Sequence, residues 1–188
     1  MIGNGARFSP CRSYRYSLWR DGLGPSGMKR HAMFVGLNPS TADETNNDPT
    51  VRRCIAFARA WGYGALCMTN LFAFRATKPS DMKRVDDPVG PDNDQALVEL
   101  AQSAGIVVAA WGTHGSWMGR DRAVRALISN WHCLRLTRDG HPSHPLYLPG
   151  SLLPVPWPPA MNPAGVVDEP GLAAGAGAHS WVAPDRID

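Results

Sequence analysis

The sequence has little lysine, few cysteines and no long hydrophobic run. Only three of its 19 basic residues are lysine, so arginine carries most of the positive charge, and arginine suits bidentate contacts with phosphate. The four cysteines form no C-x-x-C pair and stand at no zinc-finger spacing to histidine, so we predict no metal site. No stretch approaches the roughly 18 apolar residues of a membrane span, and no apolar segment follows Met1. We therefore expect a cytoplasmic protein that does not enter a membrane.

Composition and charge set further limits. The 188 residues are 44% hydrophobic, which is enough for a core and excludes global disorder. The formal net charge is only +3, but residues 1–30 hold six basic residues and one acid. We predict that this basic leading segment contacts nucleic-acid phosphates, particularly through Arg12, Arg15 and Arg20. The alternative is a solvated hairpin at the edge of the fold.

Apolar runs and segments with helical spacing alternate along the chain. Buried strands are predicted at residues 32–37, 65–71, 106–111 and 133–136. Helices are predicted between them at residues 51–61, 92–104 and 120–130. Asp48 stands where an N-cap is expected, and Pro49 takes the first helical position. This order predicts a three-layer α/β/α domain over residues 31–148, built on a central four-stranded parallel sheet.

Different structure is predicted for the two terminal segments. Residues 12–20 alternate like a strand, and Asp21-Gly22 follows as a turn, which predicts a hairpin within residues 1–30. Residues 149–188 contain eight prolines and a run of alanine and glycine. Because this composition cannot bury a core, we predict a flexible tail there.

Polar clusters stand at the carboxyl ends of the predicted strands. They are Asn38-Pro39-Ser40, Asn70, the stretch from Trp111-Gly112 to His114 and the segment that begins at His141. Ligands of parallel sheets bind beyond the carboxyl ends of the strands, so we expect these four clusters to form one site. The sequence has neither G-x-G-x-x-G nor a phosphate-binding loop, so hydrolysis of a nucleoside triphosphate is not supported.

Four segments carry a resemblance to a known superfamily. They are Gly36-Leu37-Asn38-Pro39-Ser40, Thr69-Asn70-Leu71-Phe72, Ala110-Trp111-Gly112 and His141-Pro142-Ser143-His144-Pro145-Leu146. This set resembles the uracil-DNA glycosylase superfamily, in the Gly-x-Asn-Pro form of its mismatch-specific members. Residues 12–148 resemble more closely an uncharacterised bacterial family, known as a domain of unknown function, that looks related to this superfamily.

The resemblance implies catalytic roles for several residues. Asn38 would hold the water that attacks the sugar carbon, and Asn70 would read the base edge with both halves of its amide. His141 would stabilise the departing base, but His144 interrupts the last motif and is the other candidate for that place. Asp43 is a candidate general base or supporting acid.

The resemblance also implies contacts around the reacting centre. Substrate contacts are expected from Gly36, Leu37, Pro39, Ser40, Phe72, Ser143 and His144. Leu146 or Tyr147 would enter the gap left by a flipped base, or else pack in the core. Residues 41–48 replace the aromatic-containing turn that normally packs on that base. The reaction needs neither a cofactor nor a metal.

These observations predict a DNA glycosylase-like protein with the fold of that superfamily. It would recognise a base or modified base and excise it by N-glycosidic hydrolysis. One alternative keeps the fold and modifies a nucleobase or nucleotide in another way. The second alternative is a nucleic-acid-binding module without turnover. DNA or a nucleotide is the expected partner in each case.

Overall fold

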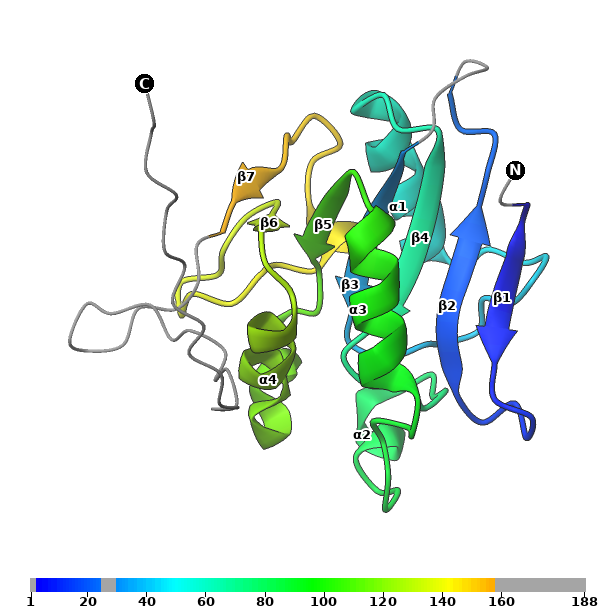
Figure 1. Cartoon of the computed structure of the whole chain (residues 1–188). Coiled ribbons are helices and arrows are strands. Elements are labelled where there is room, and N and C mark those ends of the chain that lie inside the picture. Colours follow the sequence, from blue (N-terminus) through cyan, green and yellow to red (C-terminus); the bar gives the residue numbers. More distant parts are fainter. Residues whose placement is uncertain (1–2, 25–29, 158–188) are drawn as a thin grey trace, which may run out of the picture.

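The computed structural model describes residues 3–24 and 30–157, which form a seven-stranded mixed sheet covered by helices (Figure 1). The strands are β1 (Gly5–Phe8), β2 (Arg15–Arg20), β3 (His31–Gly36), β4 (Ala65–Asn70), β5 (Ile106–Ala109), β6 (Trp131–Cys133) and β7 (Val155–Pro156). The α-helices of the described residues are α1 (Pro49–Ala60), α2 (Pro79–Met82), α3 (Asn93–Ser103) and α4 (Arg120–Leu127). The strand order in the sheet is β1-β2-β4-β3-β5-β6-β7.

Parallel strands form the middle of this sheet. β3 pairs in parallel with β4 and β5, and β5 pairs in parallel with β6. The predicted parallel core is therefore confirmed, but the prediction of a four-stranded sheet is wrong. β2 adds an antiparallel strand beside β4, and β7 adds another beside β6. These additions come from the arginine-rich and proline-rich terminal segments, which lack the continuous apolar runs typical of buried parallel strands.

The last parallel strand begins earlier than the sequence predicts. The prediction places it at residues 133–136, whereas β6 comprises Trp131–Cys133. Trp131 and Cys133 are buried, while Arg135 is exposed beyond the end of the strand. The chain then folds back, and the amide of Ser143 donates to the carbonyl of Arg135 (2.8 Å). The segment after β6 is therefore stabilised by hydrogen bonding to the chain that folds back on it, and not by pairing with the sheet.

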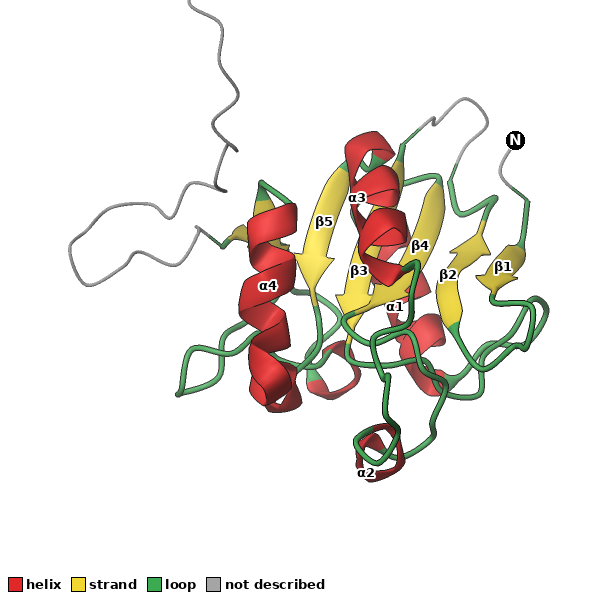
Figure 2. Ribbon diagram, turned by 60° about the horizontal axis from the view of Figure 1, so that its bottom comes forward, coloured by secondary structure: helices red, strands yellow, loops and turns green. Residues whose placement is uncertain are grey.

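Helices cover both faces of the sheet, because successive strand residues point to opposite sides. Phe34 of β3 belongs to the same apolar cluster as Phe57 of α1. Its neighbour Val35 belongs to a second cluster with Leu97 of α3 and Val124 of α4. Figures 1 and 2 show α3 and α4 on one side of the sheet and α1 on the other. None of the helices in the described part of the chain is long and apolar enough to cross a membrane.

Helix α1 begins as its sequence predicts. The side chain of Asp48 accepts a hydrogen bond from the amide of Val51 (2.8 Å), and Pro49 is the first helical residue. Trp61 closes the helix, and Gly62 follows with a φ of +81°, a conformation that glycine adopts without strain. The predicted N-cap and helix end are both confirmed. The cap places Asp48 next to the carboxyl edge of the parallel strands.

The basic N-terminal segment is a hairpin built into the sheet. β1 pairs antiparallel with β2, and β2 pairs antiparallel with β4. Within the hairpin Arg7 faces Ser17, whereas Phe8 faces Arg15, so β2 has one extra residue at Tyr16. Such a β-bulge re-aims the neighbouring side chains. Arg15 is thereby directed toward the loop that follows β3, where it donates to the carbonyl of Ala42 (2.7 Å).

The beginning of the predicted flexible tail is part of the fold. β7 pairs with β6, and the amide of Trp157 donates to the carbonyl of Trp131 (2.7 Å). The indole of Trp157 contacts that of Trp111, and the guanidinium of Arg125 lies over it. The prediction of a tail from residue 149 is therefore wrong for residues 149–157. The proline-rich composition predicted a tail, but the packing of a single tryptophan fixes this segment on the fold. Residues 158–188 lie outside the described part of the chain.

Candidate functional site

A cavity of about 820 Å³ lies at the carboxyl ends of the parallel strands. Its walls include Gly36 at the end of β3, Asn70 at the end of β4 and Trp111 after β5. The chain passes from β3 to β4 on one side, and then crosses to β5 on the other side of β3. Open α/β sheets bind their ligands at such a reversal of strand order. The cavity therefore lies where the topology favours a site.

Most of the residues predicted for substrate contact face this cavity. Those that line it are Gly36, Leu37, Asn38, Ser40, Asn70, Ser143, His144, Leu146 and Tyr147. Four predicted residues are not part of its lining, namely Pro39, Asp43, Phe72 and His141. Phe72 is fully buried and packs against Trp117, so it belongs to the core and not to the cavity wall. Segments that are far apart in sequence meet as predicted, but only some of the residues within them line the cavity.

Asn38 is fixed by the chain that surrounds it. Its Nδ2 donates to the carbonyl of Ala76 (2.7 Å) and to that of Pro39 (3.1 Å). These two acceptors determine which end of the amide is nitrogen. No hydrogen bond to Oδ1 is present among the described residues. Asn38 therefore has a carbonyl oxygen left to accept from a water or from a ligand.

Asn70 has the opposite half of its amide unused. The side chain is almost fully buried at the cavity, and its Nδ2 has no hydrogen-bond partner in the described structure. A Cβ atom at Gly36 would lie 2.9 Å from its Oδ1, so glycine leaves the space that this amide occupies. A buried amide N–H₂ without an acceptor costs free energy in the empty protein. A ligand acceptor at this position would remove that cost.

Side chains from α3 and α4 donate hydrogen bonds to the turn that carries Asn70. Nδ2 of Asn93 donates to the carbonyls of Asn70 (3.1 Å) and Leu71 (2.9 Å). Nε of Arg120 donates to the carbonyl of Leu71 as well (2.8 Å), and Arg120 also forms an ion pair with Asp94. Asn93 and Arg120 are both buried. Neither residue was predicted to support the site, because nothing in the sequence around an asparagine or an arginine of a helix indicates a hydrogen bond to a distant turn.

His144, and not His141, faces the cavity. Nδ1 of His144 accepts from the amide of Leu146 (3.3 Å), so the neutral ring carries its proton on Nε2. Burial lowers the pKa of His144, while the nearby Asp48 carboxylate partly opposes this effect. His141 is outside the cavity lining, and its amide is bonded to Thr137 Oγ1 (3.2 Å). Of the two histidines that the sequence left open, only His144 therefore lines the cavity.

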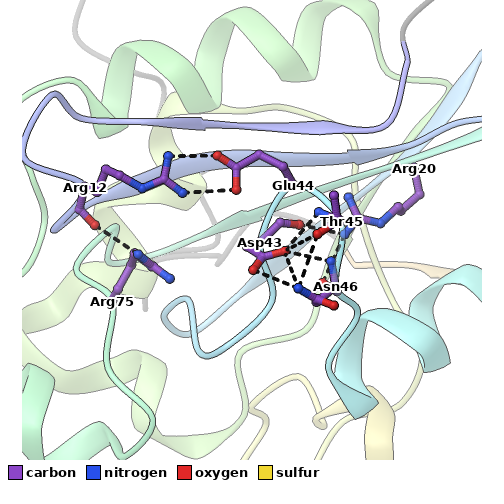
Figure 3. Close-up of polar contacts among 7 residues, drawn as sticks. All are labelled: Arg12, Arg20, Asp43, Glu44, Thr45, Asn46 and Arg75. Atoms are coloured by element: carbon purple, nitrogen blue, oxygen red, sulfur yellow. Dashed lines mark hydrogen bonds and ion pairs between the residues drawn. The ribbon is translucent and has the colours of Figure 1, made fainter.

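Asp43 organises a loop and does not face the cavity. Its Oδ1 accepts from the amides of Thr45 (2.9 Å) and Asn46 (2.7 Å), and Figure 3 shows these contacts folded around the carboxylate. Hydrogen bonds from Asn46 and Thr45 hold the pKa of Asp43 well below its ordinary value. A carboxylate stabilised in this way is a poor proton acceptor. Asp43 is therefore poorly placed for the role of general base that the sequence predicted.

The three arginines predicted to bind DNA all contact the loop of residues 41–47. Arg12 is exposed and forms a bidentate ion pair with Glu44 (2.8 and 3.0 Å), which is drawn in Figure 3. Arg15 and Arg20 are buried. Nη2 of Arg20 donates to the carbonyls of Asp43 (2.7 Å) and Asn46 (3.1 Å). For Arg20 this burial corrects the prediction of a contact with duplex phosphates, whereas Arg15, although buried, is among the residues that line the cavity.

Besides the exposed Arg135, two charged residues of the cavity were not assigned to it from sequence. Asp48, considered only as a helix cap, and Arg15, considered as a DNA contact, both line it. A carboxylate at the N-cap of a helix that starts at the carboxyl edge of a sheet was a usable signal for Asp48. On the rim, Leu146 and Tyr147 are exposed. Among residues 3–24 and 30–157, no group of three or more His, Cys, Asp or Glu side chains is placed to hold a metal ion.

Comparison with known proteins identifies a family without an assigned activity. Neither the curated proteins nor the solved structures contain a match to this chain. A family model described as "protein of unknown function (DUF1643)" matches residues 15–146, a range that includes every cavity residue discussed above except Tyr147. Because this match covers more than half of the sequence, the chain belongs to the DUF1643 family.

Proposed function

We propose that the cavity binds a nucleobase and that the protein hydrolyses an N-glycosidic bond, as the motifs of the sequence suggest. The observation that supports this most directly is the complementary state of two amides. Asn38 has a free carbonyl oxygen, while Asn70 has a buried and unpartnered Nδ2 at the same cavity. One amide can hold a water, and the other can donate to a base carbonyl.

In this proposal the bond changes follow from the groups that line the cavity. The water oxygen held by Asn38 forms a bond to the sugar carbon while the bond from that carbon to the base nitrogen breaks. The electron pair of the broken bond stays on the base, and the Nε2–H of His144 donates to the developing negative charge. Asp48 accepts the proton that the water loses. Its Oδ1 caps α1, and it also lines the cavity.

The test is single-turnover cleavage of oligonucleotides that carry a panel of modified bases, with strand breaks scored after alkali. Asn38→Ala and His144→Asn should each lower the rate by about 10²–10³, because each removes a group that acts mainly in the transition state. Binding of an uncleavable analogue should hardly change in either variant. Asn70→Asp should weaken that binding and change base preference, because a carboxylate cannot donate.

His141→Asn is the matched control, and it should keep the rate within about threefold, since that ring does not line the cavity. The wild-type rate should decline only as the pH falls below the ordinary histidine pKa of about 6.5, because burial lowers the pKa of His144. Protonation then removes the Nδ1 acceptor of the Leu146 amide. Binding without release of any base would contradict the hydrolysis, and the non-catalytic module would replace it.

A further inference from the structure

Three arginines of the described residues are buried, and their states differ. Arg20 is 4% exposed and makes four hydrogen bonds, to Trp19, Asp43, Asn46 and Asn47. Arg120 is 7% exposed and is bonded to Leu71 and to Asp94. Arg15 is 2% exposed and its side chain makes one hydrogen bond, from Nη1 to the carbonyl of Ala42 (2.7 Å). The most buried of the three therefore has the fewest partners, and it is the one that lines the cavity.

The unused part of Arg15 is one whole edge of the guanidinium. Nε is buried and has no hydrogen-bond partner, and Nη2 makes no hydrogen bond with the described residues. Nε–H and Nη2–H point along the same edge, at the spacing of two oxygens of a phosphate or a carboxylate. The single bond to Ala42 holds the opposite side of the group. The side chain is thus anchored by Nη1 while its bidentate edge is uncommitted.

No carboxylate of the described residues forms an ion pair with Arg15, and only the more distant charges of Asp48 and Asp43 favour its charged form. Asp48 lines the same cavity, but one of its oxygens accepts from Val51. Burial lowers the pKa of Arg15 to about 10, which still leaves the guanidinium charged at neutral pH. A buried cation without a direct ion-pair partner is unfavourable, and an anionic ligand group in contact with it would relieve this cost.

We propose that Arg15 binds an anionic group of the ligand inside the cavity, in a bidentate contact with two of its oxygens. Given the proposed function, on which this step rests, the ligand is a nucleotide whose phosphoryl group lies on Arg15 while its base lies on Asn70. A cavity of about 820 Å³ has room for both parts, since small-molecule sites span roughly 300–1,000 Å³. The phosphoryl group belongs either to a free nucleotide or to the strand next to the target base.

The experiment compares the dissociation constants of a 2′-deoxynucleoside and its 5′-monophosphate by calorimetry on the full chain. The monophosphate should bind at least about tenfold more tightly, because charge-assisted bidentate bonds are the strong ones. Inorganic phosphate, compared with chloride at equal ionic strength, should compete with the monophosphate. In Arg15→Gln the ratio of the two constants should fall to about one. In Arg15→Lys, which keeps the charge and a donor for Ala42, it should fall by severalfold.

Two exposed arginines serve as comparisons for the loss of a charge. Arg122→Gln on α4, away from the cavity, should leave the ratio unchanged within about twofold. Arg135 lies on the cavity wall and is exposed. If Arg135→Gln abolishes the ratio while both Arg15 variants keep it, the proposal is overturned. Thermal unfolding of each variant shows whether the loop of residues 41–47 has survived, and Arg15→Lys carries the test where Arg15→Gln does not fold.

Oligonucleotides distinguish the two sources of the phosphoryl group. A strand with a neutral methylphosphonate on the 5′ side of the target base is compared with the ordinary phosphodiester. A loss of affinity that depends on Arg15 in this pair assigns the site to the strand, and dependence in the nucleoside pair assigns it to a free nucleotide. Absence of Arg15 dependence in both pairs and for inorganic phosphate overturns the proposal. Dependence on Arg15 without release of any base retains the anion site and removes the proposed hydrolysis.

Discussion

At the scale of single residues, the cavity is defined by polar atoms that the fold leaves without partners. Asn38 uses its nitrogen to bind the chain at Ala76, so its oxygen is available. Asn70 has a buried nitrogen without a partner, and Arg15 has an unpartnered edge. Most buried polar groups in proteins are hydrogen-bonded, so exceptions that gather at one cavity indicate a ligand. Solvent-exposed charges such as Arg122 carry no comparable information.

Gly36→Ala should impair ligand binding more than it impairs folding. The new Cβ would lie 2.9 Å from Oδ1 of Asn70, so the amide must move from its present position. We expect at least about a tenfold loss of nucleotide affinity, with a cost of about 1–3 kcal/mol in the free energy of unfolding. Calorimetric binding and urea unfolding measure the two effects.

The matched control for this change is Gly5→Ala. No heavy atom lies within 4 Å of a Cβ built at Gly5, so both affinity and stability should stay near those of the wild type. Full affinity in Gly36→Ala would show that the position of the Asn70 amide does not determine binding.

At the scale of elements, the β1–β2 hairpin shapes the loop that borders the site. The loop of residues 41–47 follows the first motif and takes its conformation from Asp43 and from arginines of the hairpin (Figure 3). Arg20 contributes more than Arg12, because it is buried and its donors are shared among several carbonyls. The positive charge of the N-terminal segment is therefore largely used within the protein. Arg12, which is exposed, is the only one of its three predicted DNA contacts that lies at the surface among the described residues.

Arg20→Met should destabilise the protein far more than Arg12→Met. Removing the guanidinium of Arg20 takes the donor from two part-buried hydrogen bonds to loop carbonyls and leaves a gap in a buried position, which should lower the free energy of unfolding by about 2–4 kcal/mol. The exposed pair of Arg12 with Glu44 should contribute little, since water competes for both groups. Urea unfolding of both variants provides the comparison.

The same pair of variants also tests the original DNA prediction for Arg12. If this side chain contacts a phosphate, Arg12→Met should reduce the salt slope of DNA affinity by roughly 0.9. An unchanged slope would assign Arg12 to the loop alone. Equal stability losses in the two variants would contradict the difference in burial on which the comparison rests.

At the scale of the whole molecule, both terminal segments extend a parallel core that would otherwise have open edges. β2 covers the free edge of β4, and β7 covers that of β6. The edge strands of the sheet are thereby β1 and the two-residue β7, and short edge strands offer little backbone for pairing with other chains. The second of them depends on Trp157, which contacts Trp111 beside the cavity. The site and the C-terminal end of the described fold are thus connected through one pair of indoles.

A chain that ends at Leu148 should be less stable than one that ends at Trp157 by about 2–4 kcal/mol. The shorter chain loses β7, the packing of Trp157 and the hydrogen bond from Nε1 of Trp61 to the carbonyl of Leu152 (3.0 Å). Urea unfolding of both truncated proteins measures the difference. Trp157→Ala in the longer chain should account for much of it, and equal stability of the two chains would restore the prediction of a tail from residue 149.

Local patterns in the sequence determined the parallel strands, the start of α1 and the segments that meet at the cavity. Apolar runs between turn residues specify strands, and Asp48 with Pro49 caps a helix, through contacts within a few residues. Only the tertiary structure showed which residues line the cavity: His144 and Arg15 do, whereas His141 and Asp43 do not. Those outcomes depend on burial and on partners distant in sequence. Ala42, for example, accepts a hydrogen bond from a residue 27 positions away, and no local pattern encodes such a contact.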